Sequence, residues 1–93
     1  DIPNLAKEWL EVRLEGLKSE PTYGKSSIAI LKELVKTGRM KPEEIEKRLN
    51  LSRGHILNCL NLLELYGLVE KDYDGSYKPS ELLRKYQEVL GRF

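Results

Sequence analysis

The sequence has little of several features that mark other classes of protein. Cys59 is the only cysteine, so no disulfide can form within the chain, which excludes a disulfide-stapled secreted scaffold. No apolar run is long enough to span a bilayer, and the first residues lack the charged and apolar regions of a signal peptide. We therefore expect a soluble, cytoplasmic protein. The chain starts at Asp1 and not at a methionine, which leaves open that it is a fragment of a larger protein.

Groups that perform catalysis or bind metals are also scarce. His55 and Cys59 stand four residues apart, but a metal site needs three or four ligands and the chain has no other histidine or cysteine. The carboxylates are scattered and suggest no nucleophile, base and orienting group that would act together. The stretch Gly24-Lys25-Ser26 resembles the end of a phosphate loop, yet that motif needs a glycine where Ser19 stands. We expect no enzyme, no metal and no cofactor.

Charge is nearly balanced in total but unevenly distributed. The net charge is +1, while residues 25–53 hold eight basic and four acidic groups, against three and five in 1–24 and five and six in 54–93. A local basic excess of this size is a weak indication that the segment contacts nucleic acid. Lysine and glutamate together make 22 residues while glutamine appears once, a bias that suggests a thermophilic source.

Length and periodicity predict one mostly helical domain over residues 1–93. The hydrophobic content of 40% suits a single modest core. Asn4 is expected to cap a first helix that reaches about Ser19, and a second helix over 25–37 ends at Gly38. The apolar arc of the first helix is wide, so it has two readings: contact with the domain's own core alone, or contact with a partner as well.

The middle of the chain predicts two helices joined by a short turn. Pro42 suits the first position of a third helix, and Asn50 tolerates the left-handed conformation of a tight turn. Ser52 is expected to cap a fourth helix, which Gly67 closes. Beyond it, "LVEKDY" alternates in the manner of a strand, and Asp74-Gly75 predicts a two-residue hairpin turn that leads to the short strand "SYK".

The chain is expected to end in one further helix. Ser80 follows a proline and can cap it, and its apolar residues recur with helical spacing. We therefore divide the domain into an N-terminal helix and turn (1–24), a central part (25–80) and a C-terminal helix (81–93).

This order of elements resembles the winged helix-turn-helix domain, in the form used by the ArsR and MarR groups of small prokaryotic and archaeal regulators. The resemblance covers roughly residues 25–81, and its most specific part is "LSRGHILNCLNLLELYGLVEKDYDGSYKPS" (51–80). In that family a serine-capped recognition helix is followed by Gly-Leu-Val, which leads into the wing, and by a Tyr-x-x-Ser/Thr step into the final helix. The resemblance implies a mostly α fold with a small β-hairpin wing, and double-stranded DNA binding by a transcription regulator.

The fourth helix is the expected reader of DNA bases. Ile56, Leu60 and Leu63 form its core stripe by spacing, so the opposite side is exposed. The resemblance places the groove-facing positions on that side, where arginine can bond guanine, asparagine can bond adenine and leucine can touch a thymine methyl. The expected base contacts are Arg53, His55, Leu57, Asn58 and Asn61. Arg53, Asn58 and Asn61 could equally be ordinary solvated surface.

Phosphate contacts have to come from elsewhere, since this helix has one arginine and one histidine. The basic residues near the helix ends and the hairpin turn are the candidates: Lys25, Lys41, Lys47, Arg48, Lys71 and Lys78. Asp72 and Asp74 nearly cancel the charge of Lys71 in the wing.

The two terminal helices carry more apolar surface than the central part obviously covers. Similar proteins often dimerise through such helices, which sets two recognition helices about one DNA turn apart. The expected dimer or partner contacts are Trp9, Leu10, Leu14, Leu17, Leu83, Tyr86, Leu90 and Phe93. We expect a homodimer on double-stranded DNA.

Two other functions fit the same sequence. The chain could be the winged-helix module of a larger DNA-handling ATPase or replication protein, with its first helix as the link to that body. It could instead be a protein-binding adaptor that uses Leu57, Leu62 and Leu65, which lie outside the core stripe.

Overall fold

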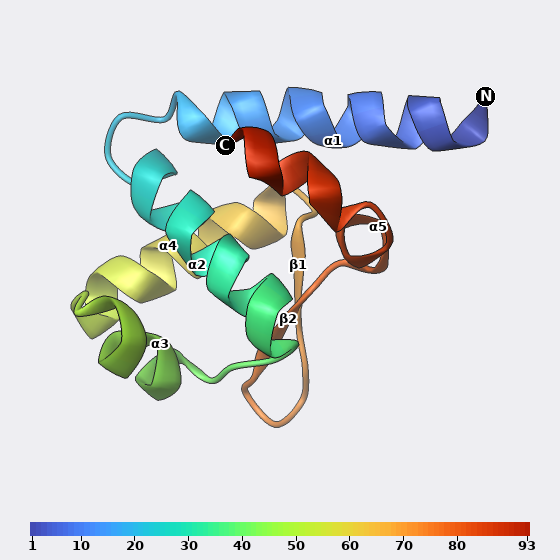
Figure 1. Cartoon of the computed structure of the whole chain (residues 1–93). Helices are drawn as coiled ribbons and strands as arrows, with labels where there is room; N and C mark the ends of the chain where they lie inside the picture. Colours follow the sequence, from blue (N-terminus) through green and yellow to red (C-terminus); the bar gives the residue numbers. More distant parts are fainter.

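Figure 1 shows the computed structural model, which describes all residues from 1 to 93. The elements in chain order are α1 (Ile2–Lys18), α2 (Gly24–Thr37), α3 (Pro42–Leu49), α4 (Arg53–Leu65), β1 (Val69–Lys71), β2 (Tyr77–Pro79), α5 (Glu81–Lys85) and the 3₁₀ helix η1 (Gln87–Arg92). α1 runs along one side of the molecule, with α2 and α4 below it (Figure 1). α3 and the tip of the hairpin lie on the side away from α1, while η1 returns toward it. The predicted winged helix-turn-helix architecture is confirmed.

The helix-turn-helix forms through local signals that the sequence carries. Pro42 is the first residue of α3, where its missing N–H costs no hydrogen bond, and the Glu44 carboxylate accepts from the N–H of Lys41 at 2.9 Å. Asn50 ends α3 in the left-handed conformation, with φ 53°. The Ser52 hydroxyl then accepts from the N–H of His55 at 3.2 Å and so begins α4. These predicted positions are confirmed.

The first helix begins earlier than the sequence predicted. Asp1 is its N-cap in place of Asn4, and its carboxylate accepts from the N–H of Asn4 at 2.9 Å. Pro3 explains the difference, because a proline is tolerated within the first turn of a helix and does not have to precede it. α1 therefore starts at Ile2 and extends one turn farther.

The hairpin forms the wing, with a longer loop than predicted. β1 and β2 pair antiparallel, and Met40 adds an isolated bridge to Tyr77. The strands end at Lys71 and resume at Tyr77, so the two-residue turn at Asp74-Gly75 is corrected to a loop over residues 72–76. The loop closes because the carboxylate of Asp74 accepts from both the N–H and the hydroxyl of Ser76, at 2.9 and 2.7 Å.

The C-terminal segment is two short helices and not one. Ser80 caps α5 as predicted, accepting from the N–H of Leu83 at 3.3 Å. Tyr86 then leaves the helical conformation, with φ −117° and ψ 38°, and the chain continues as η1. This break directs η1 onto α1, where Lys7 pairs with Glu88 at 3.3 Å and Arg92 pairs with Glu11.

One hydrophobic core joins all the helices to the wing. It contains leucines and isoleucines from each α-helix, together with Met40, Cys59 and Tyr77. α1 and α2 meet closely at Gly24, where a Cβ atom would lie 2.4 Å from the carbonyl oxygen of Leu17. Only glycine allows this approach, so the junction sets how α1 lies across α2 and α4.

Candidate nucleic-acid interface

α4 presents one face to the core and the other to solvent. Ile56, Leu60 and Leu63 are fully buried as predicted, and Cys59 joins them. The opposite face carries five exposed residues without charge, Gly54, Leu57, Asn58, Asn61 and Leu65, beside the exposed carboxylate of Glu64. We call this set the α4 ridge. It offers amide groups for hydrogen bonding and two leucine side chains, of which Leu57 is 40% and Leu65 is 80% exposed.

Leu62 does not belong to the exposed surface that the adaptor reading requires. It is half-buried and packs against the hydrophobic core. Its position on the helix turns it toward the core instead of the ridge, because neighbouring α-helical residues point about 100° apart. Of the three leucines expected to meet a protein partner, only Leu57 and Leu65 are exposed.

Arg53, the first residue of α4, is held by carboxylates of α3. Its Nε and Nη2 atoms both lie 2.5 Å from one carboxylate oxygen of Glu46, and Glu43 lies 3.7 Å away. About half of the Arg53 side chain is exposed, at 49%. An expected base contact therefore starts from an ion pair, which must open before the guanidinium can bond a base.

His55 and Asn58 contact the start of α2. The Nε2 atom of His55 lies 2.9 Å from the Ser26 hydroxyl, and the ring of Tyr23 is 5.3 Å from the imidazole. Asn58 donates to the Tyr23 hydroxyl at 3.2 Å. These contacts hold α4 against the start of α2. His55 is therefore only partly accessible, whereas Asn58 remains exposed. Asn61 makes no side-chain hydrogen bond.

Cys59 lies on the buried side of this arrangement. Its Sγ atom is 3.8 Å from the carbonyl oxygen of Tyr23. Burial raises the pKa of the Cys59 thiol, against a smaller opposite effect of the Ser27 hydroxyl. The thiol therefore stays protonated near neutral pH and behaves as a small core residue.

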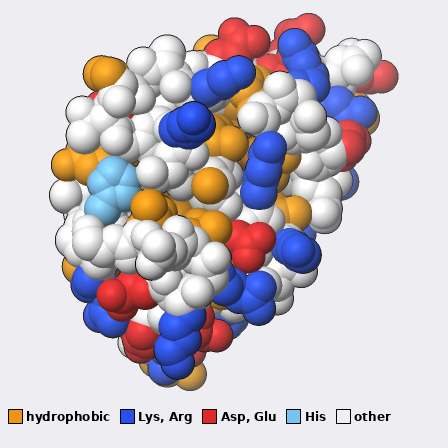
Figure 2. Space-filling model, turned by 60° about the vertical axis from the view of Figure 1, so that its left-hand side comes forward, with side chains coloured by type: hydrophobic (Ala, Val, Ile, Leu, Met, Phe, Trp, Pro, Cys, Tyr) orange, Lys and Arg blue, Asp and Glu red, His pale blue; other side chains and the backbone are white.

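The expected phosphate contacts fall into two groups. Lys25, Lys41, Lys47 and Lys71 are exposed and have no carboxylate within ion-pair distance. Arg48 instead pairs with Glu33 at 3.3 Å, and Lys78 lies 3.8 Å from Asp72. The face seen in Figure 2 shows Lys and Arg side chains separated by hydrophobic and acidic ones.

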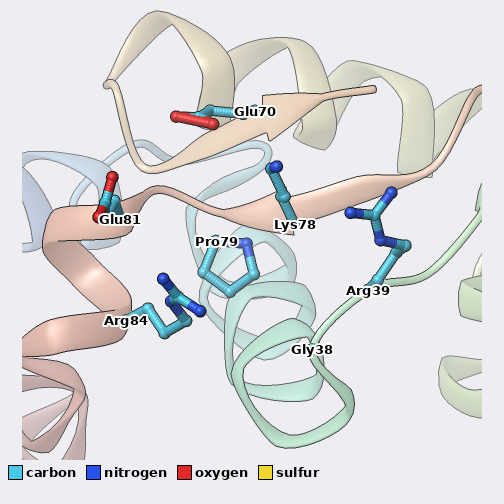
Figure 3. A pocket seen from close by; sticks show the side chains of 7 residues that line it. All are labelled: Gly38, Arg39, Glu70, Lys78, Pro79, Glu81 and Arg84. Atoms are coloured by element: carbon cyan, nitrogen blue, oxygen red, sulfur yellow. The ribbon is translucent and has the colours of Figure 1, made fainter. Parts of the chain in front are cut away.

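Arg39 is a charged residue of the wing region that sequence reasoning missed. It lies in the link between α2 and α3, yet it pairs with Asp72 and donates to the Ser76 hydroxyl at 3.1 Å. Arg39 and Lys78 are among the residues that line a 240 Å³ pocket, and Glu81 and Arg84 of α5 lie on the side of it opposite Arg39 (Figure 3). No pattern in the sequence joins residues 39 and 72, because tertiary folding alone brings them together.

The wing tip carries an exposed aromatic ring and a stabilised carboxylate. Tyr73 is fully exposed. The hydroxyl and N–H of Ser76 hold the pKa of the Asp74 carboxyl below its ordinary value. The wing therefore keeps its acidic charge at neutral pH, as Asp72 and Asp74 together oppose Lys71.

Most of the expected dimer or partner contacts belong to the chain's own core. Five of them are fully or nearly fully buried and therefore cannot contact a partner: Leu10, Leu14, Leu17, Leu83 and Leu90. Tyr86 and Phe93 are partly buried against the same core. Leu10, Leu14 and Leu17 lie in the core that α1 shares with α2 and η1, so they are not exposed to a partner. Trp9 alone of the eight is an exposed residue, at 41%.

A different part of α1 is uncovered. Ile2, Leu5, Trp9 and Val12 recur at helical spacing and are 79%, 64%, 41% and 71% exposed. We call these four residues the α1 stripe. Arg13 lies over the Trp9 ring at 4.7 Å and shields part of it.

Comparison with known proteins identifies a related family. The model of the family described as sugar-specific transcriptional regulator TrmB matches residues 25–87, which begin at α2 and end at the start of η1. No curated protein matches, and no solved structure matches. None of the helices has the length and apolar composition that crossing a membrane requires.

Proposed function

Because the chain belongs to the TrmB family of sugar-specific transcriptional regulators, we propose that it binds double-stranded DNA as a homodimer in the cytoplasm. In this proposal the N-terminal half of α4 enters the major groove, and lysines around it contact phosphates. The family accounts for DNA binding in transcription regulation; the mode of contact is inferred from this chain's own residues.

The exposed, uncharged α4 ridge is the observation that carries the proposal. Asn58 and Asn61 lie one turn apart on it, and an asparagine amide can form two hydrogen bonds with adenine in the major groove. Leu57 lies beside them and can contact a thymine methyl.

Affinity in this proposal comes from lysines outside the ridge. Lys25 lies at the start of α2, Lys41 precedes α3 as its N-cap, Lys47 lies on α3, and Lys71 lies in the wing. Because each is exposed and free of a carboxylate partner, each can neutralise a phosphate and release a counterion. Arg48 and Lys78 would first have to leave Glu33 and Asp72, so we rank them behind these four lysines.

Arg53 and His55 complete the proposed base contacts. Arg53 has to exchange Glu46 for DNA, whereas His55 is only partly accessible and already contacts the Ser26 hydroxyl. We therefore assign sequence preference mainly to Asn58 and Asn61, with Arg53 as a conditional contact.

The α1 stripe is the proposed dimer contact, in place of the buried leucines. Two copies that meet through Leu5, Trp9 and Val12 would cover exposed apolar surface, which is otherwise unfavourable in water. A symmetric dimer presents two α4 ridges to successive major-groove segments and doubles the number of phosphate contacts. Sedimentation should show a dimer that Leu5→Glu plus Val12→Glu converts to monomer.

The exposed Leu57 and Leu65 favour one alternative function, a surface that binds another protein. The two leucines lie eight residues apart on α4, so a partner that covered both would also cover Asn58 and Asn61. DNA binding and this alternative therefore exclude each other on the same ridge, and DNA binding can be tested directly.

Fluorescence anisotropy of the protein against a random-sequence duplex, from 50 to 300 mM salt, tests the proposal. We expect binding that weakens steeply with salt, and selection from a random library should then yield a preferred site. Asn58→Ala plus Asn61→Ala should relax that preference, while Asn4→Ala, an exposed asparagine on α1, should leave it unchanged. Absence of binding at 50 mM salt would contradict the proposal and favour the protein-binding alternative.

A further inference from the structure

A groove on the molecule lies away from the α4 ridge. It has a volume of about 380 Å³ and is lined by Lys18, Lys25, Ile28, Ala29, Lys32 and Phe93. These residues come from the end of α1, from α2 and from the C-terminal residue, and none comes from α3, α4 or the wing. We call it the lysine groove. It shares only Lys25 with the surface that the proposed function uses.

The lysine groove combines an apolar floor with a basic rim. Ile28, Ala29 and the ring of Phe93 supply the apolar surface. The three lysines have no carboxylate within ion-pair distance, although the chain holds 15 acidic residues. Lys18 instead lies over the Phe93 ring, 5.9 Å from its centre. The rim charge is therefore uncompensated within the molecule.

The groove continues into two neighbouring hollows. It shares Lys18 and Phe93 with one hollow, and it shares Lys32 with another that Val35 and Leu90 also line. Lys25 and Val35 are ten residues apart on α2, so the combined trough is about 15 Å long at the rise of an α-helix. That length equals almost three turns of a helix laid along α2. Figure 2 shows such a surface, on which hydrophobic side chains emerge between basic ones.

We propose that the lysine groove binds an acidic amphipathic helix of a partner protein. Aliphatic side chains of that helix would cover Ile28, Ala29 and Phe93, and its carboxylates would pair with the lysines. Lys25 and Lys32 are two turns apart on α2, so carboxylates two turns apart on the partner match them. The partner binds without covering the α4 ridge, but it shares Lys25 with the proposed phosphate contacts and competes with DNA for that one lysine.

Nucleic acid is the less suitable occupant of the groove. A phosphate backbone would meet the three lysines but would leave the apolar floor either exposed or covered by charge, and burying charge against apolar surface is unfavourable. The absence of α4 and wing residues from the lining also separates these lysines from the proposed DNA contacts, apart from Lys25. Protein is therefore the occupant that uses both the floor and the rim.

The test uses the full chain and a designed 14-residue helical peptide, with leucines along one face and glutamates two turns apart on its flank. Nuclear magnetic resonance titration should shift the amide signals of Ile28, Ala29 and Lys32. A peptide of the same composition in scrambled order should not bind. Lys18→Glu plus Lys32→Glu should weaken binding at least about tenfold, because both rim charges are reversed. The matched control, Lys36→Glu plus Lys85→Glu, reverses two exposed lysines outside the groove and should change affinity less than about twofold.

Two results would overturn the proposal. One is that the peptide does not bind in the groove, seen either as no binding at millimolar peptide or as peptide-induced shifts that map to the α4 ridge. The other is that duplex DNA shifts the groove signals and that Lys18→Glu plus Lys32→Glu abolishes DNA binding, since the groove would then serve nucleic acid. Lys18→Glu plus Lys32→Glu should change DNA affinity less than about threefold. Peptide binding and DNA binding are therefore measured separately, and either proposal can fail without the other.

Discussion

Glu46→Gln should strengthen DNA binding by releasing Arg53. In the free protein, two nitrogen atoms of the Arg53 guanidinium lie 2.5 Å from one oxygen of Glu46. The pair must open before the guanidinium can bond a base or phosphate. Glutamine occupies nearly the same volume but carries no charge, so the substitution removes the competing ion pair and leaves the packing of α3 in place.

The size of the effect follows from the exposure of the pair. The side chains of Arg53 and Glu46 are 49% and 32% exposed, so solvent screens their attraction. An exposed ion pair is worth about 0.2 to 1 kcal/mol. Releasing it should raise affinity about 1.4- to 5-fold per subunit, or about 2- to 30-fold for a dimer that uses both arginines. Glu43, 3.7 Å from Arg53, can replace part of the lost partner and so favours the lower end.

Anisotropy titrations at a fixed salt concentration measure the gain, with Glu8→Gln as the control. Glu8 is an exposed carboxylate on α1, so its neutralisation reports the general effect of removing one negative charge. In an Arg53→Ala background the gain from Glu46→Gln should disappear. Weaker binding by Glu46→Gln would refute the reasoning, because Glu46 would then orient Arg53 toward DNA. Unchanged affinity would show that Arg53 makes no DNA contact.

Three further predictions concern the lysines, the helix junction and the wing. With four phosphate contacts per subunit, the slope of log affinity against log salt should be about −3.6, and Lys47→Ala should reduce its magnitude by about 0.9. Lys36→Ala is the control and should not change the slope. An unaltered slope for Lys47→Ala would show that Lys47 contacts no phosphate. Gly24→Ala should lower the free energy of unfolding by about 1 to 3 kcal/mol or more, because its Cβ would lie 2.4 Å from the Leu17 carbonyl oxygen. Urea denaturation measures this loss, and a loss under about 0.5 kcal/mol would contradict the close approach. The pKa of the Asp74 carboxyl is lowered by the Ser76 hydroxyl and N–H, so its stabilisation of the wing is present above the ordinary value near about pH 4 and is lost as pH falls below it. The protection factor of the Ser76 amide, its intrinsic exchange rate divided by the observed rate, should therefore fall over that range, and Asp74→Asn should remove this pH dependence.

Local signals in the sequence predicted most of the helices. Asn50, Ser52 and Ser80 stand where a tight turn and two caps were expected, and Pro42 begins α3. Such signals act between residues three or four apart, so they can be read without the tertiary structure. They fail where several residues compete for one role. Asp1 replaced Asn4 as the cap of α1, and Ser76 drew Asp74 into a longer loop than a two-residue turn.

The candidate site was predicted in part. Spacing placed Leu57, Asn58 and Asn61 on the exposed side of α4, because Ile56, Leu60 and Leu63 had to face the core. Spacing could not show that Glu46 holds Arg53 or that Tyr23 accepts from Asn58, which is 35 residues away along the chain. It also could not distinguish the four free lysines from Arg48 and Lys78.

The sequence by itself determined the order of the elements, the core face of α4 and the conformations of its caps and turns. Only the tertiary structure decided which side chains remain available for contact. The packing of α1 against α2 and η1 buries Leu10 and Leu14 and leaves Leu5 and Val12 exposed, and the meeting of α1, α2 and Phe93 creates the lysine groove. The physical reason is range: hydrogen bonds within a helix turn depend on neighbours in the chain, whereas burial and ion pairing depend on segments that only folding brings together.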